Sequence, residues 1–132
     1  MRVDYRSGDR FDIAIRDHLV TVDQPLDLGG DDLGPTPTEL FVAGLATCVA
    51  FYARRYLRRH KLDANGLAVE ASYRLGSAPA RVSDIDICVH LPFELPPARR
   101  DGLLAVAGHC TVHNSITHPP RIDITLANQD CR

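Results

Sequence analysis

A strong helix start followed by a long apolar run is the feature that most limits how this chain can fold. Thr36 suits the N-cap position, Pro37 suits the first helical position, and Glu39 completes a capping box with Thr36. The run that follows contains no Pro and continues to Arg59 or His60. The pattern predicts one helix of about 24 residues, about 36 Å long.

The predicted helix is apolar on two opposite sides. One side comprises Phe41, Gly44, Leu45, Cys48, Tyr52 and Tyr56, and the other comprises Ala43, Ala46, Ala50, Ala53 and Leu57. A helix that is apolar all round has to be buried all round. Because a chain of 132 residues can hardly surround such a rod, we expect a second subunit to cover part of it.

Alternating polar and apolar residues predict strands before and after this helix. Residues 2–23 favour two or three antiparallel strands, and residues 67–75 and 82–91 favour a hairpin that turns across 77–80. In the second strand of the hairpin, the inward positions are Ile85, Ile87, Val89 and Leu91, and the outward positions are Asp86, Cys88 and His90.

The last part of the chain predicts a helix and a strand. Pro96 and Pro97 open the helix, whose buried stripe comprises Leu103, Val106, Ala107 and Cys110. Residues 121–126 predict a final strand with Ile122 and Ile124 facing inward. The order of elements indicates an α+β fold with antiparallel sheets, formed by residues 1–132 as one domain.

Charge and hydropathy narrow the partners and the location. Fifteen Lys and Arg residues against seventeen Asp and Glu residues give a net charge of -2, so neither nucleic acid nor a membrane surface is an expected partner. The first twenty residues are charged throughout, and no 18 consecutive residues are apolar, so we expect neither a signal peptide nor a membrane span. We therefore expect a cytoplasmic protein whose four cysteines are reduced at rest.

The cysteine pattern alone favours structural roles. Cys48 and Cys110 both lie on apolar helix faces, where a cysteine usually behaves as a small buried hydrophobe. Cys88 lies on the polar side of a strand and Cys131 lies near the chain end, so neither is assigned a role.

A histidine and cysteine cluster raises the question of metal binding. His109, Cys110 and His113 could bind zinc or iron if Cys48 completed the set, because thiolate and imidazole are preferred ligands. Structural zinc normally takes four ligands, often in two closely spaced pairs, and only one loose cluster is present. We therefore expect no metal and no bound cofactor.

Two segments of the sequence resemble a known family. GGDDLGPTPTELFVAGLATCVA (29–50) and HCTVHNSI (109–116) are similar to the OsmC/Ohr family, which comprises osmotically inducible protein C and the organic hydroperoxide resistance proteins. The similarity in spacing and element order extends from DYRSGDRF through VDQP to RIDITL. The resemblance implies an intertwined homodimer in which antiparallel sheets wrap around two long central helices.

The resemblance also implies a function. It implies a thiol-dependent peroxidase of oxidative stress defence, in which Cys48 attacks an organic hydroperoxide and Cys110 resolves the product as a disulfide. An external dithiol then reduces that disulfide. Glu39 matches the family's carboxylate near the start of the long helix.

The family's activating arginine comes from the N-terminal strands. Candidates here are Arg6, Arg10 and Arg16. We select Arg10, because it follows the turn predicted at 7–9. The alternative for Arg10 is a solvated turn residue.

One departure from the family pattern keeps a second function open. Thr111 follows Cys110 where many relatives have Pro. The alternative is a non-peroxidase thiol protein of the same fold that binds a metal or small ligand at the same two cysteines, Cys48 and Cys110, with His113 beside them. A third reading is that both thiols are inert core residues. His113 either orients Cys110 or caps the helix end.

Overall fold

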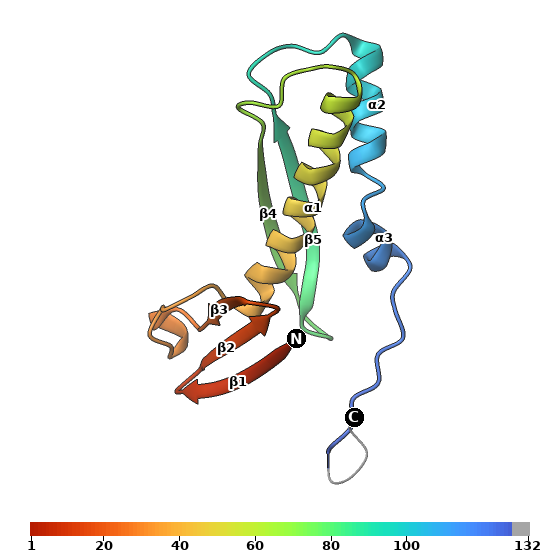
Figure 1. The fold of residues 1–132 in the computed structure, drawn as a ribbon. Helices are drawn as coiled ribbons and strands as arrows, with labels where there is room; N and C mark the ends of the chain where they lie inside the picture. Colours follow the sequence, from red (N-terminus) through yellow and green to blue (C-terminus); the bar gives the residue numbers. More distant parts are fainter. Residues whose placement is uncertain (128–132) are drawn as a thin grey trace.

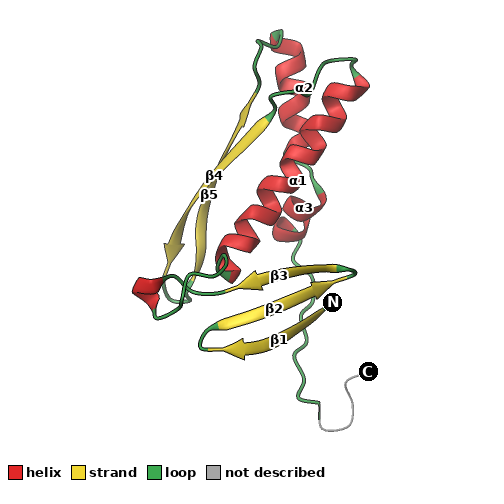
Figure 2. Ribbon diagram, turned by 60° about the vertical axis from the view of Figure 1, so that its left-hand side comes forward, coloured by secondary structure: helices red, strands yellow, loops and turns green. Residues whose placement is uncertain are grey.

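A computed structural model describes residues 1–127 of the chain. A three-stranded sheet lies at the N-terminal end of the long helix α1, and a two-stranded hairpin runs along one side of α1 (Figures 1 and 2). The helix α2 packs beside the C-terminal half of α1, and the short helix α3 follows it (Figure 1).

The N-terminal sheet consists of β1 (Arg2–Ser7), β2 (Arg10–Ile15) and β3 (His18–Val22). The strands are antiparallel in the order β1-β2-β3. The sequence prediction of two or three antiparallel strands is therefore confirmed, with three. A short 3-10 helix, η1 (Leu26–Leu28), follows the sheet.

The long helix α1 spans Pro37–Arg59, with His60 as its C-cap. The Thr36 hydroxyl accepts a hydrogen bond from the Glu39 N–H at 3.1 Å, and the Glu39 carboxylate accepts one from the Thr36 N–H at 3.0 Å. Both halves of the predicted capping box are present, and the predicted start and end of the helix are confirmed.

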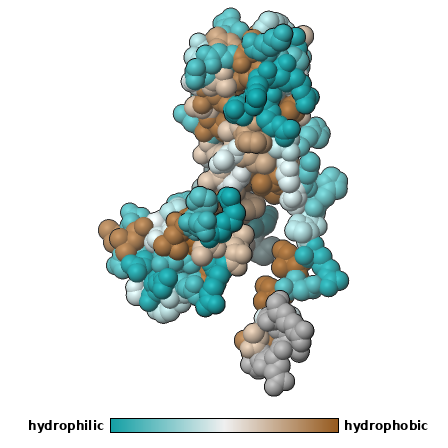
Figure 3. Space-filling view, in the orientation of Figure 1, coloured by the Kyte–Doolittle hydropathy of each residue, from teal (hydrophilic) through white to brown (hydrophobic). Residues whose placement is uncertain are grey.

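Within the single chain, α1 is buried on one side only. The buried positions are Val42, Leu45, Val49, Ala53, Tyr56 and Leu57. The buried stripe takes residues from both predicted apolar sides and leaves the remainder of the helix surface uncovered, where the sequence predicts a second subunit. On the rest of the helix Phe41 remains 45% exposed and Phe51 remains 53% exposed. Figure 3 shows hydrophobic surface at the narrow waist of the molecule, between the sheet and the helix pair.

By length and mean hydropathy, 1.2 over its most apolar window, α1 resembles a membrane-spanning helix. A core helix passes the same criterion, and α1 packs against α2 and the β-hairpin. Its last turns carry Arg54, Arg55, Arg58 and Arg59.

The hairpin consists of β4 (Ala68–Gly76) and β5 (Arg81–His90), paired antiparallel. Its turn covers 77–80, as the sequence predicts. Ile85, Ile87 and Val89 are half-buried and pack against the hydrophobic core, whereas Asp86, Cys88 and His90 are exposed. The predicted strand pair and its inward face are confirmed.

The second helix is shorter than the buried stripe in the sequence suggests. The helix α2 spans Pro97–Ala107 and stops at Gly108, and a separate helix α3 spans Thr111–Thr117. Cys110 therefore does not belong to α2, and its placement at the end of that helix was wrong. The chain breaks the helix at Gly108 and restarts it after Cys110, which is the N-cap of α3.

A glycine sets the distance between α1 and α2. A Cβ atom at Gly102 would lie 2.5 Å from the Tyr56 hydroxyl oxygen. Only a residue without a side chain permits this close approach, so Gly102 lets the two helices pack together.

The predicted final strand is absent from the described chain. Residues 118–127 have no regular secondary structure, and Ile124 and Leu126 are 92% and 84% exposed. The prediction of a strand over 121–126 with Ile122 and Ile124 inward is wrong for the single chain. A strand forms only against a neighbouring strand, and none of the described strands pairs with this segment. Cys131 lies outside the described residues.

Candidate thiol site

Cys48 lies in the middle of α1 and is half-buried. It packs against a buried cluster formed by Leu45 and Val49 of α1 together with Ala107 and Cys110. Leu45 lies about one turn before Cys48, and Val49 directly follows it. This helical spacing places the thiol beside the core. The mid-helix position keeps this sulfur away from the positive end of the α1 dipole.

Cys110 is fully buried, with 0% of its surface exposed. As the N-cap residue of α3, it accepts a hydrogen bond at its Sγ atom from the backbone N–H of His113, at 3.4 Å. The break between α2 and α3 therefore has a local function, because it places a sulfur atom where a capping oxygen normally lies.

The two sulfur atoms are neighbours in the fold. The Cys48 side chain packs against the buried cluster that contains Cys110, although the two residues come from α1 and from the start of α3. Burial raises the pKa of the Cys110 thiol, and the adjacent Cys48 raises it further. The backbone N–H groups of His113 and Val112 oppose this rise. Cys110 is therefore a protonated thiol at neutral pH, in direct contact with a second thiol.

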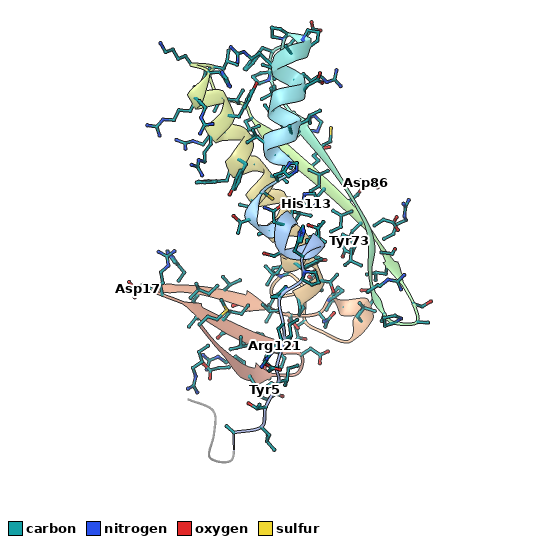
Figure 4. The ribbon with its side chains drawn as sticks, turned by 90° about the vertical axis from the view of Figure 1, so that its right-hand side faces the viewer. Tyr5, Asp17, Tyr73, Asp86, His113 and Arg121 are labelled. Carbon is teal, nitrogen blue, oxygen red and sulfur yellow. The ribbon has the colours of Figure 1, made fainter. Side chains whose placement is uncertain are left out.

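His113 connects the end of α2 to the start of α3. Its ring Nδ1 bonds the carbonyl oxygen of Gly108, while its backbone N–H bonds Cys110. Because a carbonyl oxygen only accepts, Nδ1 carries the proton and Nε2 is left as the basic ring atom. Figure 4 shows His113 on α3, beside the hairpin. Of the two readings of His113, the helix cap matches the ring contact, because Gly108 is the C-cap of α2, whereas only the His113 backbone N–H reaches Cys110.

A second contact between α1 and α3 lies beside the thiol pair. The hydroxyl groups of Tyr52 and Thr111 are 3.0 Å apart. Tyr52 follows Cys48 by one helical turn, and Thr111 follows Cys110 directly. The sequence analysis did not identify this pair. The only signal was the one-turn spacing of Tyr52 from Cys48.

An apolar groove of about 270 Å³ borders the thiol cluster. Its lining combines Leu45 and Val49 of α1 with residues of β5 and of the α2–α3 region, including Ile85, Ile87, Val89, Leu104, Ala107, Gly108 and His113. Leu45, Val49 and Ala107 also belong to the cluster that contains Cys110. The groove is therefore suited to an apolar organic group beside the sulfur atoms.

Glu39 lies at the exposed start of α1, where its carboxylate closes the capping box. Nine residues of helix separate it from Cys48, about 14 Å along the axis. Within one chain, the fold therefore does not bring Glu39 to the thiols, and its catalytic role stays a prediction.

Arg10 begins β2 and is half-buried. Its Nε atom is buried and has no hydrogen-bond partner among residues 1–127. Its charge contributes to lowering the pKa values of Asp12 and Asp23. Arg6, by contrast, forms an ion pair with Asp12 at 2.6 Å. In the described part of the chain, no arginine forms an ion pair with Glu39, and the assignment of Arg10 also stays a prediction.

Asp23, which the sequence analysis did not single out, organises the segment before α1. It is 1% exposed and accepts hydrogen bonds from the backbone N–H groups of Gln24, Asp31 and Leu33. Burial alone would raise the pKa of Asp23, but these donors, with a smaller contribution from Arg10, hold it below the ordinary value. The start of the first family motif, at Asp31 and Leu33, is therefore held by hydrogen bonds to the Asp23 carboxylate.

His109, Cys110 and His113 are the residues that could hold a metal ion together with Cys48. Across residues 1–127, no three side chains of His, Cys, Asp or Glu are grouped closely enough to hold a metal ion. Nδ1 of His109 and Nδ1 of His113 each bond a backbone carbonyl, of Ala105 and Gly108 respectively.

The fold and the site define an α+β protein with two thiols in contact at the junction of a long central helix and a short one. Residues 29–125 match the family model of OsmC, described as OsmC-like protein, and the chain belongs to this family. The α+β class and the family resemblance predicted from the sequence are thereby confirmed. No curated protein sequence matches the chain significantly.

Solved structures share this fold. A protein of Psychrobacter arcticus assigned to the osmotic stress induced and detoxification response is 25% identical, with a TM-score of 0.80 over 86% of this chain and 85% of that one. An organic hydroperoxide resistance protein OsmC of Legionella pneumophila is 21% identical, with a TM-score of 0.63 over 87% of each chain. A Vibrio cholerae protein named for organic hydroperoxide resistance holds captopril in one of its active sites; it is 19% identical, with a TM-score of 0.66 over 86% of this chain and 81% of that one.

Proposed function

We propose that this protein is a cytoplasmic, homodimeric thiol peroxidase that reduces organic hydroperoxides through Cys48 and Cys110. The contact between these two thiols is the observation that carries the proposal, because a resolving cysteine has to reach the oxidised sulfur. The names of the Legionella and Vibrio proteins, which refer to organic hydroperoxide resistance, support the same role in defence against oxidative stress.

In the first step, the Cys48 thiolate attacks the outer oxygen of the O–O bond. The S–O bond forms as the O–O bond breaks, and the organic fragment leaves as an alcohol after taking a proton. Cys48 is then a sulfenic acid, and the peroxide has been reduced by two electrons. The apolar groove beside Leu45 and Val49 would hold the organic fragment of the substrate.

In the second step, the Cys110 sulfur attacks the Cys48 sulfur. The S–S bond forms, the S–O bond breaks, and the hydroxyl group leaves as water with the Cys110 proton. Because Cys110 is a protonated thiol, this step requires removal of its proton, and the N–H donors of His113 and Val112 stabilise the resulting thiolate. An external dithiol returns both sulfur atoms to thiols and becomes a disulfide itself.

The exposed side of α1 supports the homodimer. Phe41 and Phe51 lie on this side together with small residues, among them Ala43 and Gly44, and small residues allow a second helix to approach closely. A chain that leaves such a helix face and an apolar C-terminal segment in water would be prone to associate. A second copy of the chain presents the same apolar helix face and C-terminal segment, so each copy can cover the exposed apolar surface of the other.

We further propose that Arg10 and Glu39 complete the site in the dimer. Cys48 in an apolar environment needs a nearby cation or donor to hold its thiolate form. Arg10 supports this role because its buried Nε donor is unpaired within the described chain. Arg10→Ala and Glu39→Gln are expected to lower the rate of peroxide reduction while leaving the Cys48 thiol in place.

The function is tested by adding one equivalent of cumene hydroperoxide to the reduced protein and following peroxide loss and the oxidation of each cysteine by peptide mapping. Wild-type protein is expected to consume one equivalent and to form the Cys48–Cys110 disulfide. Cys48→Ser should abolish consumption. Cys110→Ser should still consume the first equivalent, and on addition of a second equivalent its Cys48 should proceed from sulfenic to sulfinic acid. Cys88→Ser is the matched control and should behave as wild type.

Peroxide consumption by Cys48→Ser at the wild-type rate would refute the proposal. Metal analysis of the untagged protein separates the alternative: stoichiometric zinc or iron that is lost in Cys110→Ala would favour the metal-binding thiol protein.

A further inference from the structure

Two parallel contacts join α1 to the start of α3. The Cys48 and Cys110 thiols form one, and the Tyr52 and Thr111 hydroxyls form the other, at 3.0 Å. Because Tyr52 lies one turn beyond Cys48 and Thr111 directly follows Cys110, the hydroxyl contact lies immediately beside the thiol contact.

The hydrogen bond between the Tyr52 and Thr111 hydroxyls connects two different helices, α1 and α3. Within residues 1–127, it is the one side-chain hydrogen bond that connects α1 and α3 apart from the contact between the thiols. The other side-chain hydrogen bonds of α3, made by His113, Asn114, Ser115 and Thr117, stay within the 108–118 segment.

The ring of Tyr52 is itself held in place. It lies edge-on to Phe51 with ring centres 6.3 Å apart, and the Arg55 guanidinium carbon lies 5.7 Å from its centre. It also packs against the hydrophobic cluster that contains Cys110. A hydrogen bond from a ring restrained in this way constrains its partner more than one from a freely rotating side chain.

The position of the segment that carries Cys110 depends on contacts with α1, such as the hydrogen bond from Tyr52 to Thr111. It is the junction between α2 and α3, held by hydrogen bonds of Gly108 and His113 within the segment and by the packing of Cys110 and Val112 in the hydrophobic core. Each time the disulfide opens or closes, this junction has to return to the same distance from Cys48.

We propose that Tyr52 and Thr111 form a positioning pair for disulfide formation, holding Cys110 at attacking distance from Cys48. The pair acts through Cys110 and takes no part in the attack of Cys48 on the peroxide. It therefore controls the second step, in which Cys110 displaces the hydroxyl of the Cys48 sulfenic acid and water leaves. The proposal rests on the proposed function for its biological meaning, but the geometry can be tested without peroxide.

The first measurement is the equilibrium of the Cys48–Cys110 disulfide with reduced and oxidised glutathione. The protein carries Cys88→Ser and Cys131→Ser, so that only this pair reacts. The equilibrium constant reports the effective concentration of Cys110 at Cys48. We expect Thr111→Val and Tyr52→Phe each to lower it roughly three- to tenfold, the effect of one net hydrogen bond.

Matched variants separate positioning from a general loss of stability. Thr111→Ser restores the hydroxyl and should recover most of the wild-type value. Thr117→Val makes the same substitution on α3 away from α1 and should have no effect. The double variant Tyr52→Phe with Thr111→Val should lose no more than either single variant, because both remove the same contact. If Tyr52→Phe fails to fold, the exposed Thr111 series still decides the question.

The second measurement uses one equivalent of cumene hydroperoxide. Thr111→Val should lose the Cys48 thiol at the wild-type rate but form the disulfide more slowly, so that Cys48 sulfenic acid persists longer, and a second equivalent should convert a larger fraction of it to sulfinic acid. Wild-type values for Thr111→Val in both measurements would overturn the positioning proposal. If peroxide fails to oxidise Cys48 in the wild-type protein, the proposed function fails, while the glutathione equilibrium still tests the positioning pair.

Discussion

The Oδ2 atom of Asp23 accepts a hydrogen bond from the backbone N–H of Leu33 at 3.2 Å, and thereby ties the end of β3 to the segment that leads into α1. The same carboxylate also bonds the N–H groups of Gln24 and Asp31. Since α1 carries Cys48, this carboxylate helps to set the position of the sheet relative to the helix of the thiol site.

Replacing Asp23 by Ala is expected to destabilise the protein strongly. The substitution removes a buried carboxylate that accepts three part-buried hydrogen bonds, so three N–H groups lose their acceptor. We expect the melting temperature to fall by roughly 5–15 °C, measured by circular dichroism. Asp27→Ala is the control, because Asp27 is exposed in η1, and it should melt as wild type. Equal melting temperatures for the two variants would contradict this role of Asp23.

The stability contributed by Asp23 should depend on pH in a defined direction. Its pKa in the folded state lies below the ordinary value of 3.8, so the unfolded chain binds a proton first as the pH falls. The contribution is therefore fully present above 3.8 and is lost as the pH falls through the folded-state pKa. The difference in melting temperature between wild type and Asp23→Asn should therefore stay constant well above pH 3.8 and shrink as the pH falls below that value. A difference that grows on acidification would show that the sign is wrong.

Close packing explains two of the glycines, Gly30 and Gly34, in the motif that precedes α1. A Cβ atom at Gly30 would lie 2.0 Å from the carbonyl oxygen of Gln24, and one at Gly34 would lie 2.2 Å from that of Thr21. We expect Gly30→Ala to cost about 1–3 kcal/mol or more in the free energy of unfolding, measured by urea titration. Asp31→Ala, with an exposed side chain and an unchanged backbone N–H, should cost much less.

Local sequence rules predicted the parts of the fold that depend on local chemistry. The capping box at Thr36 and Glu39 marked the start of α1, and alternation marked the hairpin, because both depend on residues close in the sequence. The break at Gly108 was missed because the apolar spacing continues through it to Cys110. The strand predicted over 121–126 was wrong because pairing depends on a partner that no local pattern specifies.

The candidate site was predictable only in part for the same reason. The resemblance singled out Cys48 and Cys110, and the fold brings their thiols together. The hydrogen bond between Tyr52 and Thr111 and the role of Asp23 depend on tertiary contacts, which composition and periodicity do not reveal. Glu39 and Arg10 lie in predicted elements, but a single chain does not bring them to the thiols.

Alkylation should distinguish the three described cysteines. Cys88 is exposed on β5, Cys48 is half-buried, and Cys110 is fully buried with a raised pKa. Because iodoacetamide reacts with accessible thiolates, we expect the reduced protein at pH 7.5 to be modified in the order Cys88, Cys48, Cys110. Peptide mapping over time measures the order, with protein unfolded in urea as the control. Faster modification of Cys110 than of Cys48 would show that the junction between α2 and α3 opens readily.

The exposed side of α1 should form the subunit interface of the proposed homodimer. Phe51 is 53% exposed on this side, and a carboxylate in its place would put a polar, charged group into an apolar helix-to-helix interface. We expect Phe51→Glu to raise the dimer dissociation constant about tenfold or more, measured by sedimentation equilibrium. Phe51→Leu is the matched control and should remain dimeric, since it keeps an apolar side chain. If wild type and Phe51→Glu sediment with the same mass, then either the protein is a monomer or the interface lies elsewhere. A wild-type monomer would remove the proposed dimer and with it the source of the residues that complete the thiol site.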